Sequence, residues 1–270
     1  MKVWFITGAS KGFGKVWAEA ALERGDSVAA TARNPDNLSD LVSKYGDRVL
    51  PLRLDVTDRE ADFAAVKRAK DKFGRLDVVV NNAGYGQFGA VEELSEAELR
   101  DQMETNLFGA VWVTQAALPI LREQGSGHIL QVSSIGGISA FVNVGAYHAS
   151  KWALEGISQA MAQEVKPFGV RVTLVEPGPF STDWRGPSSK TSEKNPAYDA
   201  IRAGQAERYK SMTSGKPEAT GPVILRLVDM EEPPLRLFLG VDPLPIAEKD
   251  YASRLEEWRK HNDLSVAANG

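Results

Sequence analysis

Tyr147 and Lys151 are the residues of this sequence whose types and spacing most directly indicate chemistry. Positions four apart on a helix share one face, so the phenol and the ammonium would point into the same space. A nearby cation favours the phenolate and lowers the pKa of a tyrosine from its usual value of about 10. The pair therefore suggests a general acid. Such a pair also occurs by chance, and alone it does not establish a site.

A glycine-rich turn near the N-terminus suggests a nucleotide cofactor. The turn, Thr7–Gly14, follows an apolar segment at 3–6 and opens a helical pattern at 13–24. Glycines in this place let the backbone approach a pyrophosphate, whose charge then lies at the positive end of the helix. The spacing is G-x-x-x-G-x-G rather than G-x-G-x-x-G, and a tight turn without a ligand is the alternative interpretation.

The end of the second predicted strand favours NADP over NAD. An acidic residue there would hold the ribose 2′-hydroxyl of NAD, whereas a cation accepts the 2′-phosphate of NADP. This strand ends in Thr31-Ala32-Arg33, and Lys11 in the glycine-rich turn is a second cation. Both cations could instead be solvated surface residues, so NAD stays open. Asp55 and Val56, after the third strand, are expected to meet the adenine, although Asp55 also suits a helix start.

Short apolar segments alternate with helical patterns along the chain, which predicts an α/β fold. Parallel strands need long crossover connections and helices on both faces of their sheet. We therefore expect a single domain over residues 1–270, a Rossmann-type doubly wound parallel sheet of about seven strands. The predicted strands are at 3–6, 28–32, 49–54, 76–80, 128–132, 170–175 and 235–239, and the helical patterns at 13–24, 60–73, 96–123, 146–165 and 221–229.

Two later segments are predicted to lie outside this alternation. The segment at about 179–217 is rich in Pro, Ser, Lys and Gly and lacks a long periodic pattern, apart from a short helix near 197–209. A connection of this length is typically a lid, a binding loop or a mobile segment, and we expect a substrate lid. The segment at about 243–261 is predicted to be a C-terminal helical extension.

The composition argues against several classes of protein. The 270 residues include no cysteine, and the three histidines are not spaced like metal ligands, so we expect no metal. The 32 basic and 36 acidic residues give a net charge of -4, and no nucleic-acid partner is expected. No apolar run is long enough to predict a membrane span. The N-terminus lacks a signal-peptide pattern, which predicts a cytoplasmic protein.

Together these motifs resemble the series found in the short-chain dehydrogenase/reductase family. The series comprises Thr7–Gly14, Asn81–Gly84, Asn106, Ser134, Tyr147 with Lys151, Pro177-Gly178 and Thr182, in this order. The stretch Glu164–Trp184 and the long segment after it are similar to the branch that includes 17β-hydroxysteroid and retinol dehydrogenases and bacterial carbonyl reductases. The resemblance implies a nicotinamide cofactor and a carbonyl or alcohol substrate.

The resemblance also implies roles for single positions. Tyr147 would protonate the carbonyl oxygen, Lys151 would lower the pKa of Tyr147 and hold the nicotinamide ribose, and Ser134 would hydrogen-bond the substrate oxygen. Asn106 would anchor a water of the proton relay, and an asparagine within an apolar helical run is itself unusual. The implied cofactor contacts are Gly8, Ser10, Lys11, Gly12, Phe13, Gly14, Arg33, Asp55, Val56, Asn82, Ala83, Gly84, Tyr147, Lys151, Pro177, Gly178 and Thr182.

Three loops should converge into a substrate pocket beyond the carboxyl ends of the strands. The pocket is predicted to include Ser134, Ile135, Phe141, Val144, Tyr147, Phe180 and Trp184, with Gln87, Phe88, Tyr209 and Met212 as further candidates. The set is largely aromatic and aliphatic and suits a hydrophobic substrate. The same residues could instead cover the core.

The sequence therefore predicts NADPH-dependent reduction of a ketone or aldehyde, or the reverse oxidation of an alcohol. An NAD-dependent secondary-alcohol dehydrogenase, a non-catalytic NADP-sensing regulator and a sugar epimerase or dehydratase are the alternatives. The regulator is disfavoured because it would not need the complete set of Ser134, Tyr147, Lys151 and Asn106. The resemblance further implies a homodimer that pairs through the helices beginning near Glu96 and Ala146.

Overall fold

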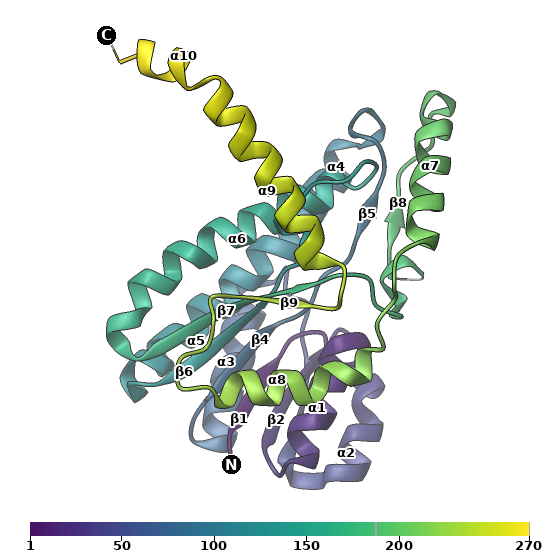
Figure 1. Ribbon diagram of the computed structural model, residues 1–270. Coiled ribbons are helices and arrows are strands. Elements are labelled where there is room, and N and C mark those ends of the chain that lie inside the picture. The colour runs from purple at the N-terminus through teal and green to yellow at the C-terminus, as the bar shows by residue number, and fades with distance from the viewer. Residues whose placement is uncertain (187, 270) are drawn as a thin grey trace.

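The computed structural model describes residues 1–186 and 188–269 and confirms the predicted doubly wound parallel sheet (Figure 1). Its seven strands lie in the order β3-β2-β1-β4-β6-β7-β9. They are β1 (Val3–Ile6), β2 (Ser27–Ala32), β3 (Val49–Arg53), β4 (Val78–Asn81), β6 (Gly127–Val132), β7 (Val170–Pro177) and β9 (Arg236–Leu239). The strand order reverses between β1 and β4, and ligands of such sheets bind beyond the carboxyl ends of the strands at this point.

Helices cover both faces of the sheet (Figure 1). α1 (Gly12–Glu23), α2 (Ser39–Tyr45) and α8 (Thr220–Asp229) pack on one face, and α3 (Arg59–Phe73), α5 (Gly109–Gln124) and α6 (Gly145–Val165) pack on the other. In β1, Trp4 and Ile6 belong to the first core and Val3 and Phe5 to the second. A strand covered on both faces is largely apolar, which explains why the segment at 3–6 is apolar at every position.

The helical pattern predicted at 96–123 is interrupted in the structure. α4 (Glu96–Met103) passes into a π-helical turn at Glu104–Phe108, and α5 follows. The turn contains the buried Asn106. π-Helical turns inside α-helices are frequent at functional sites. The predicted helical pattern at 96–123 is thus confirmed, with a π-helical turn at the residues that the sequence singles out for a special task.

The two late segments have regular structure of their own. β8 (Lys190–Thr191) pairs with β5 (Gln87–Phe88) outside the main sheet, and α7 (Asp199–Lys210) stands apart from it (Figure 1). α9 (Pro243–Lys260) projects away from the sheet and is followed by the short α10 (Asn262–Ala267). In the part of the chain that the structure describes, no helix combines the length and apolarity that crossing a membrane requires.

Asp62 in α3 is a buried carboxyl group whose titration should affect the stability of the fold. Its side chain is fully buried, and neither carboxyl oxygen has a hydrogen-bond partner among the described residues. Burial, with the charges of Asp58 and Asp55, raises the pKa of Asp62 from 3.8 to about 8. The unfolded chain therefore releases this proton at lower pH than the folded chain, and stability is lost as pH rises from about 4 to 8.

We expect Asp62→Asn to be more stable than the wild type at pH 8 by about 1–3 kcal/mol, because the amide cannot ionise. The difference should fall towards zero near pH 4. Urea unfolding at several pH values measures this, with the exposed Asp71→Asn in the same helix as the matched control. A constant difference across the pH range would contradict the predicted titration of Asp62.

Candidate active site

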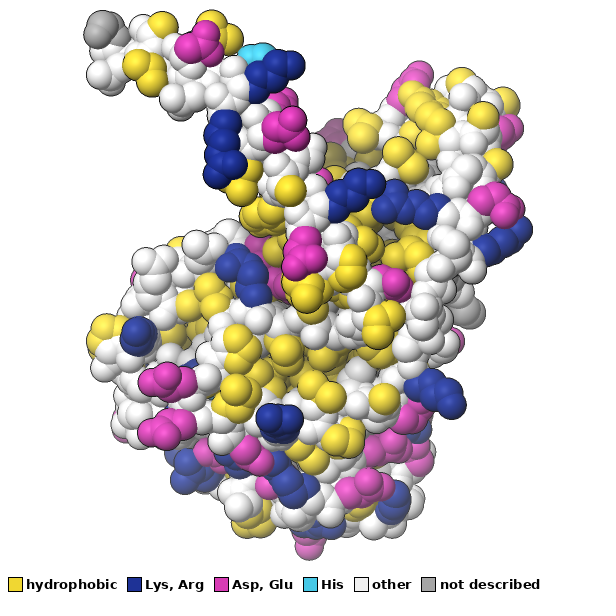
Figure 2. All heavy atoms as spheres, in the orientation of Figure 1, with side chains coloured by type: hydrophobic (Ala, Val, Ile, Leu, Met, Phe, Trp, Pro, Cys, Tyr) yellow, Lys and Arg dark blue, Asp and Glu magenta, His cyan; other side chains and the backbone are white. Residues whose placement is uncertain are grey.

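A cavity of about 1340 Å³ lies at the carboxyl ends of the strands and extends beneath α7. Hydrophobic side chains are visible in the hollow beside this helix (Figure 2). All the residues predicted to contact the cofactor line the cavity except Gly14, and all the residues predicted to contact the substrate line it. The sheet and the segment at about 179–217 thus bring together positions that are far apart in the sequence.

The glycine-rich turn has the geometry that its glycines predict. Gly8 and Gly12 have φ values of 65 and 56, a region that favours glycine. A Cβ on Gly14 would lie 2.5 Å from the carbonyl oxygen of Gly8 and from Nδ2 of Asn82. Gly14 does not line the cavity. Its lack of a side chain lets α1 begin close to Gly8 and Asn82.

Asn82 directly follows β4 and links the end of this strand to the glycine-rich turn. Its Nδ2 donates to the carbonyl oxygens of Thr7 and Gly8 at 2.9 and 3.1 Å, and Thr7 Oγ1 accepts the backbone N–H groups of Asn82 and Ala83 at 2.9 and 3.0 Å. These bonds explain why the sequence needs an amide side chain here. They hold two sides of the cavity at a fixed separation.

Asn106 connects the π-helical turn to the site. Its Oδ1 accepts the N–H of Tyr85 at 3.0 Å, and its Nδ2 donates to the carbonyl oxygen of Tyr85 at 2.9 Å and to Ser150 Oγ at 3.2 Å. Asn106 is buried and does not line the cavity. Its side chain therefore positions the Tyr85 loop and α6, and its role in holding a relay water stays a prediction.

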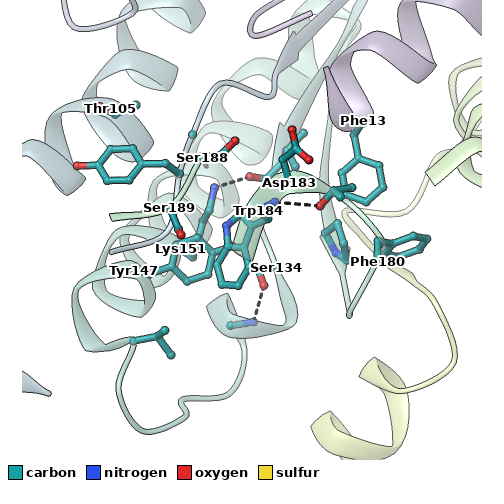
Figure 3. A pocket seen from close by; sticks show the side chains of 18 of the residues that line it. Phe13, Thr105, Ser134, Tyr147, Lys151, Phe180, Asp183, Trp184, Ser188 and Ser189 are labelled. Atoms are coloured by element: carbon teal, nitrogen blue, oxygen red, sulfur yellow. Dashed lines mark hydrogen bonds between the residues drawn. The ribbon is translucent and has the colours of Figure 1, made fainter. Parts of the chain in front are cut away.

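Tyr147, Lys151 and Ser134 meet on the wall of the cavity formed by α6 and the end of β6 (Figure 3). Tyr147 and Lys151 are buried, and Lys151 Nζ lies 5.7 Å from the centre of the phenol ring. Lys151 Nζ donates to the carbonyl oxygen of Val132 at 2.7 Å. Ser134 Oγ accepts the N–H of Gly136 at 2.9 Å, which fixes the serine at the end of its strand.

The pKa of Tyr147 differs from the sequence-based expectation. Burial raises the pKa of Tyr147 to about 12, and a hydrogen bond with Ser134 opposes this only in part. Burial also lowers the pKa of Lys151 to about 8, against the charge of Glu155. The structure therefore does not show the expected lowering of the Tyr147 pKa by Lys151, because removal of the phenolate from water dominates.

The segment at about 179–217 contacts both ends of the cavity. The ring of Trp184 makes an edge contact with Tyr147, with 5.0 Å between the ring centres, and lies beside it in Figure 3. At the other end, Lys11 in the glycine-rich turn donates to Ser188 Oγ and lies 3.9 Å from a carboxyl oxygen of Asp183. Lys11 thus contacts residues of the segment at about 179–217, whereas Arg33 is exposed at the cavity edge.

Two of the candidate pocket residues lie elsewhere. Gln87 is fully buried, where its backbone N–H donates to Gln102 and its side chain donates to Ser192. Phe88 lines a neighbouring cavity and contacts the outer side of Trp184. The prediction that Gln87 faces the substrate pocket is therefore wrong. The β5–β8 pairing, which short sequence patterns do not reveal, turns this residue into the interior.

His148 is a site residue that sequence reasoning missed. Its Nε2 accepts the N–H of Phe141 at 2.9 Å, and its Nδ1 lies 2.8 Å from the carbonyl oxygen of Gly136. The ring therefore braces the loop that carries Ile135 and Phe141 into the cavity. Among the described residues, no group of three or more histidines and acids is placed to hold a metal ion.

Comparisons with known proteins show the family of this chain. The family model described as short chain dehydrogenase matches residues 2–193. The oxidoreductase BOA17 of Botryotinia fuckeliana is 44% identical over 99% of both chains. The 3-ketodihydrosphingosine reductase of Bacteroides thetaiotaomicron is 36% identical over 97% of this chain and 94% of its own length.

Solved structures of short-chain and alcohol dehydrogenases are also similar to this chain. A short-chain dehydrogenase from Streptomyces avermitilis is 42% identical, with a TM-score of 0.92 over 99% of this chain and 100% of that one. An alcohol dehydrogenase from Thermococcus sibiricus, complexed with 5-hydroxy-NADP, is 30% identical, with a TM-score of 0.74 over 88% of this chain and 96% of that one. The similarity therefore includes both the sheet and, in the Streptomyces protein, the C-terminal helices.

Proposed function

Because this chain belongs to the short-chain dehydrogenase family and is an NAD(P)-dependent oxidoreductase, we propose that it reduces a ketone or aldehyde with NADPH and that Tyr147 supplies the proton. The observation that carries this proposal is the convergence of Ser134, Tyr147 and Lys151 in one cavity with the glycine-rich turn. The turn fits a dinucleotide because Gly8 and Gly12 line the cavity and leave its backbone free of side chains where a pyrophosphate would approach, while Gly14 lets α1 begin close to the turn.

The residues of the chain have distinct tasks in this reaction. The bound cofactor supplies a hydride for the carbonyl carbon. Ser134 donates a hydrogen bond to the carbonyl oxygen, and the proton of Tyr147 passes to that oxygen, which yields the alcohol. Lys151 stabilises the phenolate that remains until a proton is regained from solvent. The pKa of Tyr147 of about 12 keeps its hydroxyl protonated at neutral pH, which is the form that the proposed proton transfer requires.

The walls of the cavity support a hydrophobic substrate. Apolar side chains face it from three segments, and they are Ile135, Phe141, Val144, Phe180, Trp184 and Met212. The Bacteroides relative is named for a keto compound, 3-ketodihydrosphingosine. We infer that the segment at about 179–217 acts as the lid over this substrate, because it supplies Phe180, Trp184 and α7.

The preference for NADP rests on Arg33. It is an exposed cation at the edge of the cavity, on the strand end where the ribose of the cofactor is read. We expect Arg33→Ala to lower kcat/KM for NADPH by about 10- to 100-fold, since one charge-assisted hydrogen bond contributes about 1.5–3 kcal/mol. The value for NADH should change little.

Steady-state kinetics with both cofactors tests this preference, and Arg53→Ala, an exposed arginine at the end of β3, is the matched control. Equal losses for NADPH and NADH would remove Arg33 from phosphate recognition. A wild-type preference for NADH would favour the NAD-dependent alternative.

We infer that two copies of the chain pair, as in the family resemblance. Leu99 of α4 and Trp152 and Ile157 of α6 are exposed apolar residues on the two helices expected to form the contact. Arg254 of α9 lies 4.7 Å above the Trp152 ring and covers part of this surface.

A further inference from the structure

Two buried glutamates share one arginine beneath the proposed active site. Glu155 on α6 is 6% exposed and Glu176 at the end of β7 is 0% exposed. Nε of Arg236 lies 3.0 Å from Glu155 Oε2 and 3.4 Å from Glu176 Oε1. Glu155 Oε1 and both oxygens of Glu176 lack a hydrogen-bond partner among the residues that the structure describes. Buried carboxyl groups without donors are costly, so the arrangement calls for an explanation.

The glutamate pair adjoins three segments that carry proposed catalytic or cofactor residues. Glu155 lies one helical turn after Lys151, and Glu176 directly precedes Pro177 and Gly178 of the cofactor set. Ser133, next to Ser134, lines the cavity. A Cβ on Gly137 would lie 2.6 Å from Ser133 Oγ and 3.2 Å from Glu155 Oε1, so both atoms border this glycine. The pair therefore borders the cavity floor through Ser133.

One arginine cannot balance two ionised carboxylates in a buried site. Burial and the charge of Glu155 raise the pKa of Glu176 to about 9, while Arg236 opposes this. Burial also raises the pKa of Glu155. The shorter contact with Arg236 favours the charge on Glu155 and leaves the proton on Glu176. Like-charged carboxyls this close titrate as a pair and retain one proton between them.

The other charged groups near the pair are few. Lys151 lies on the same helix, and Arg236 on β9 also donates to Gln159 at 2.9 Å. Burial lowers the pKa of His148, which makes the ring neutral at pH 7. Asp250 and Arg254 of α9 pair with each other and contact the loop at Ser139 and Ile138. Lys151 is therefore the one cation beside the pair that lies in the proposed catalytic set.

We propose that Glu155 and Glu176 hold a single proton between them and that the one negative charge they retain sustains the ammonium form of Lys151. They are positioning residues, because they act on Tyr147 through Lys151 and do not touch the substrate. This proposal rests on the proposed function for its catalytic consequence, whereas the proton and the charge state of Lys151 can be measured without cofactor.

Infrared spectroscopy of the cofactor-free protein tests the shared proton. At pH 7 the wild type should show a protonated-carboxyl band that is lost in Glu155→Gln and also in Glu176→Gln, because a lone carboxylate beside Arg236 ionises. Glu164→Gln, an exposed glutamate on the same helix, should retain it. Asp62 contributes a separate band that persists in all of them. Persistence of every band in both single variants would overturn the proposal.

NMR titration of 13C-labelled lysines tests the effect on Lys151, with its resonance assigned by its loss in Lys151→Met. Glu176→Gln should shift the pKa of Lys151 by less than about 0.5 unit, because Glu155, whose charge raises this pKa, remains ionised. The double variant should lower it by at least about 1 unit. Arg236 keeps Gln159 as a partner in that protein. Additive shifts, or none in the double variant, would overturn the proposal.

Activity separates this proposal from the proposed function. The alkaline limb of the pH–rate profile should move with the pKa of Lys151, to lower pH in the double variant and not in Glu164→Gln. Infrared and NMR results as expected, with no carbonyl reduced by the wild type, would reject the proposed reaction and leave the shared proton in place. If the alkaline limb moves in the double variant but the wild type lacks the protonated-carboxyl band of the pair, the shared proton would be rejected.

Discussion

Tyr147→Phe should reduce kcat for carbonyl reduction by at least about 10²- to 10⁴-fold, the usual contribution of a positioned general acid. The change removes the transferable proton and keeps the ring that contacts Trp184. The affinity for NADPH should change little, since the ring still fills the same space. Turnover followed at the absorbance of the reduced nicotinamide, with fluorescence titration of NADPH, measures both quantities.

Tyr251→Phe is the matched control, because this tyrosine is exposed on α9, outside the described cavity. Near-normal turnover by Tyr147→Phe would refute the assignment of the acid. Tight NADPH binding by the wild type without turnover across a broad panel of carbonyls would instead support the sensing regulator.

Lys151→Met should reduce kcat by about 100-fold or more and should also raise KM for NADPH by about tenfold, because the ammonium both stabilises the phenolate and holds the nicotinamide ribose. Burial lowers the pKa of Lys151 to about 8. Its charge is therefore present below this pH and is lost as pH rises through it, so wild-type reduction should decline above about pH 8.

Lys166→Met is the control, an exposed lysine just after α6. A variant of Lys151 that loses rate but keeps its NADPH KM would confine the residue to the proton step. A wild-type profile that stays flat to pH 10 would contradict the titration of Lys151.

The fold was predictable because its signals are local. The seven strand segments are short and rich in apolar residues, and the turn at Gly8, Gly12 and Gly14 follows directly after the first of them. Cofactor and substrate candidates converge because the carboxyl ends of parallel strands share one edge of the sheet. The positions of the strands and of the glycine-rich turn could therefore be predicted from short stretches of the sequence.

What the sequence did not reveal depends on partners across the fold. The π-helical turn at Glu104–Phe108 accompanies the hydrogen bonds between Asn106 and Tyr85, which are 21 positions apart. Gln87 looks like a loop residue until β5 pairs with β8. The pKa of Tyr147 depends on burial by neighbours, which the i, i+4 spacing does not report. The contact of Glu155 and Glu176 with Arg236 joins three separate elements.

Gly86 and Trp184 restrict each other in a way that matters for redesigning the range of substrates. A Cβ on Gly86 would come within 2.7 Å of the indole, so even alanine at position 86 would displace the indole or shift the loop that carries residue 86. A smaller side chain at 184 meets no such obstacle. Enlarging the pocket is therefore a one-site change, whereas narrowing it from the Gly86 side disturbs the aromatic wall against Tyr147.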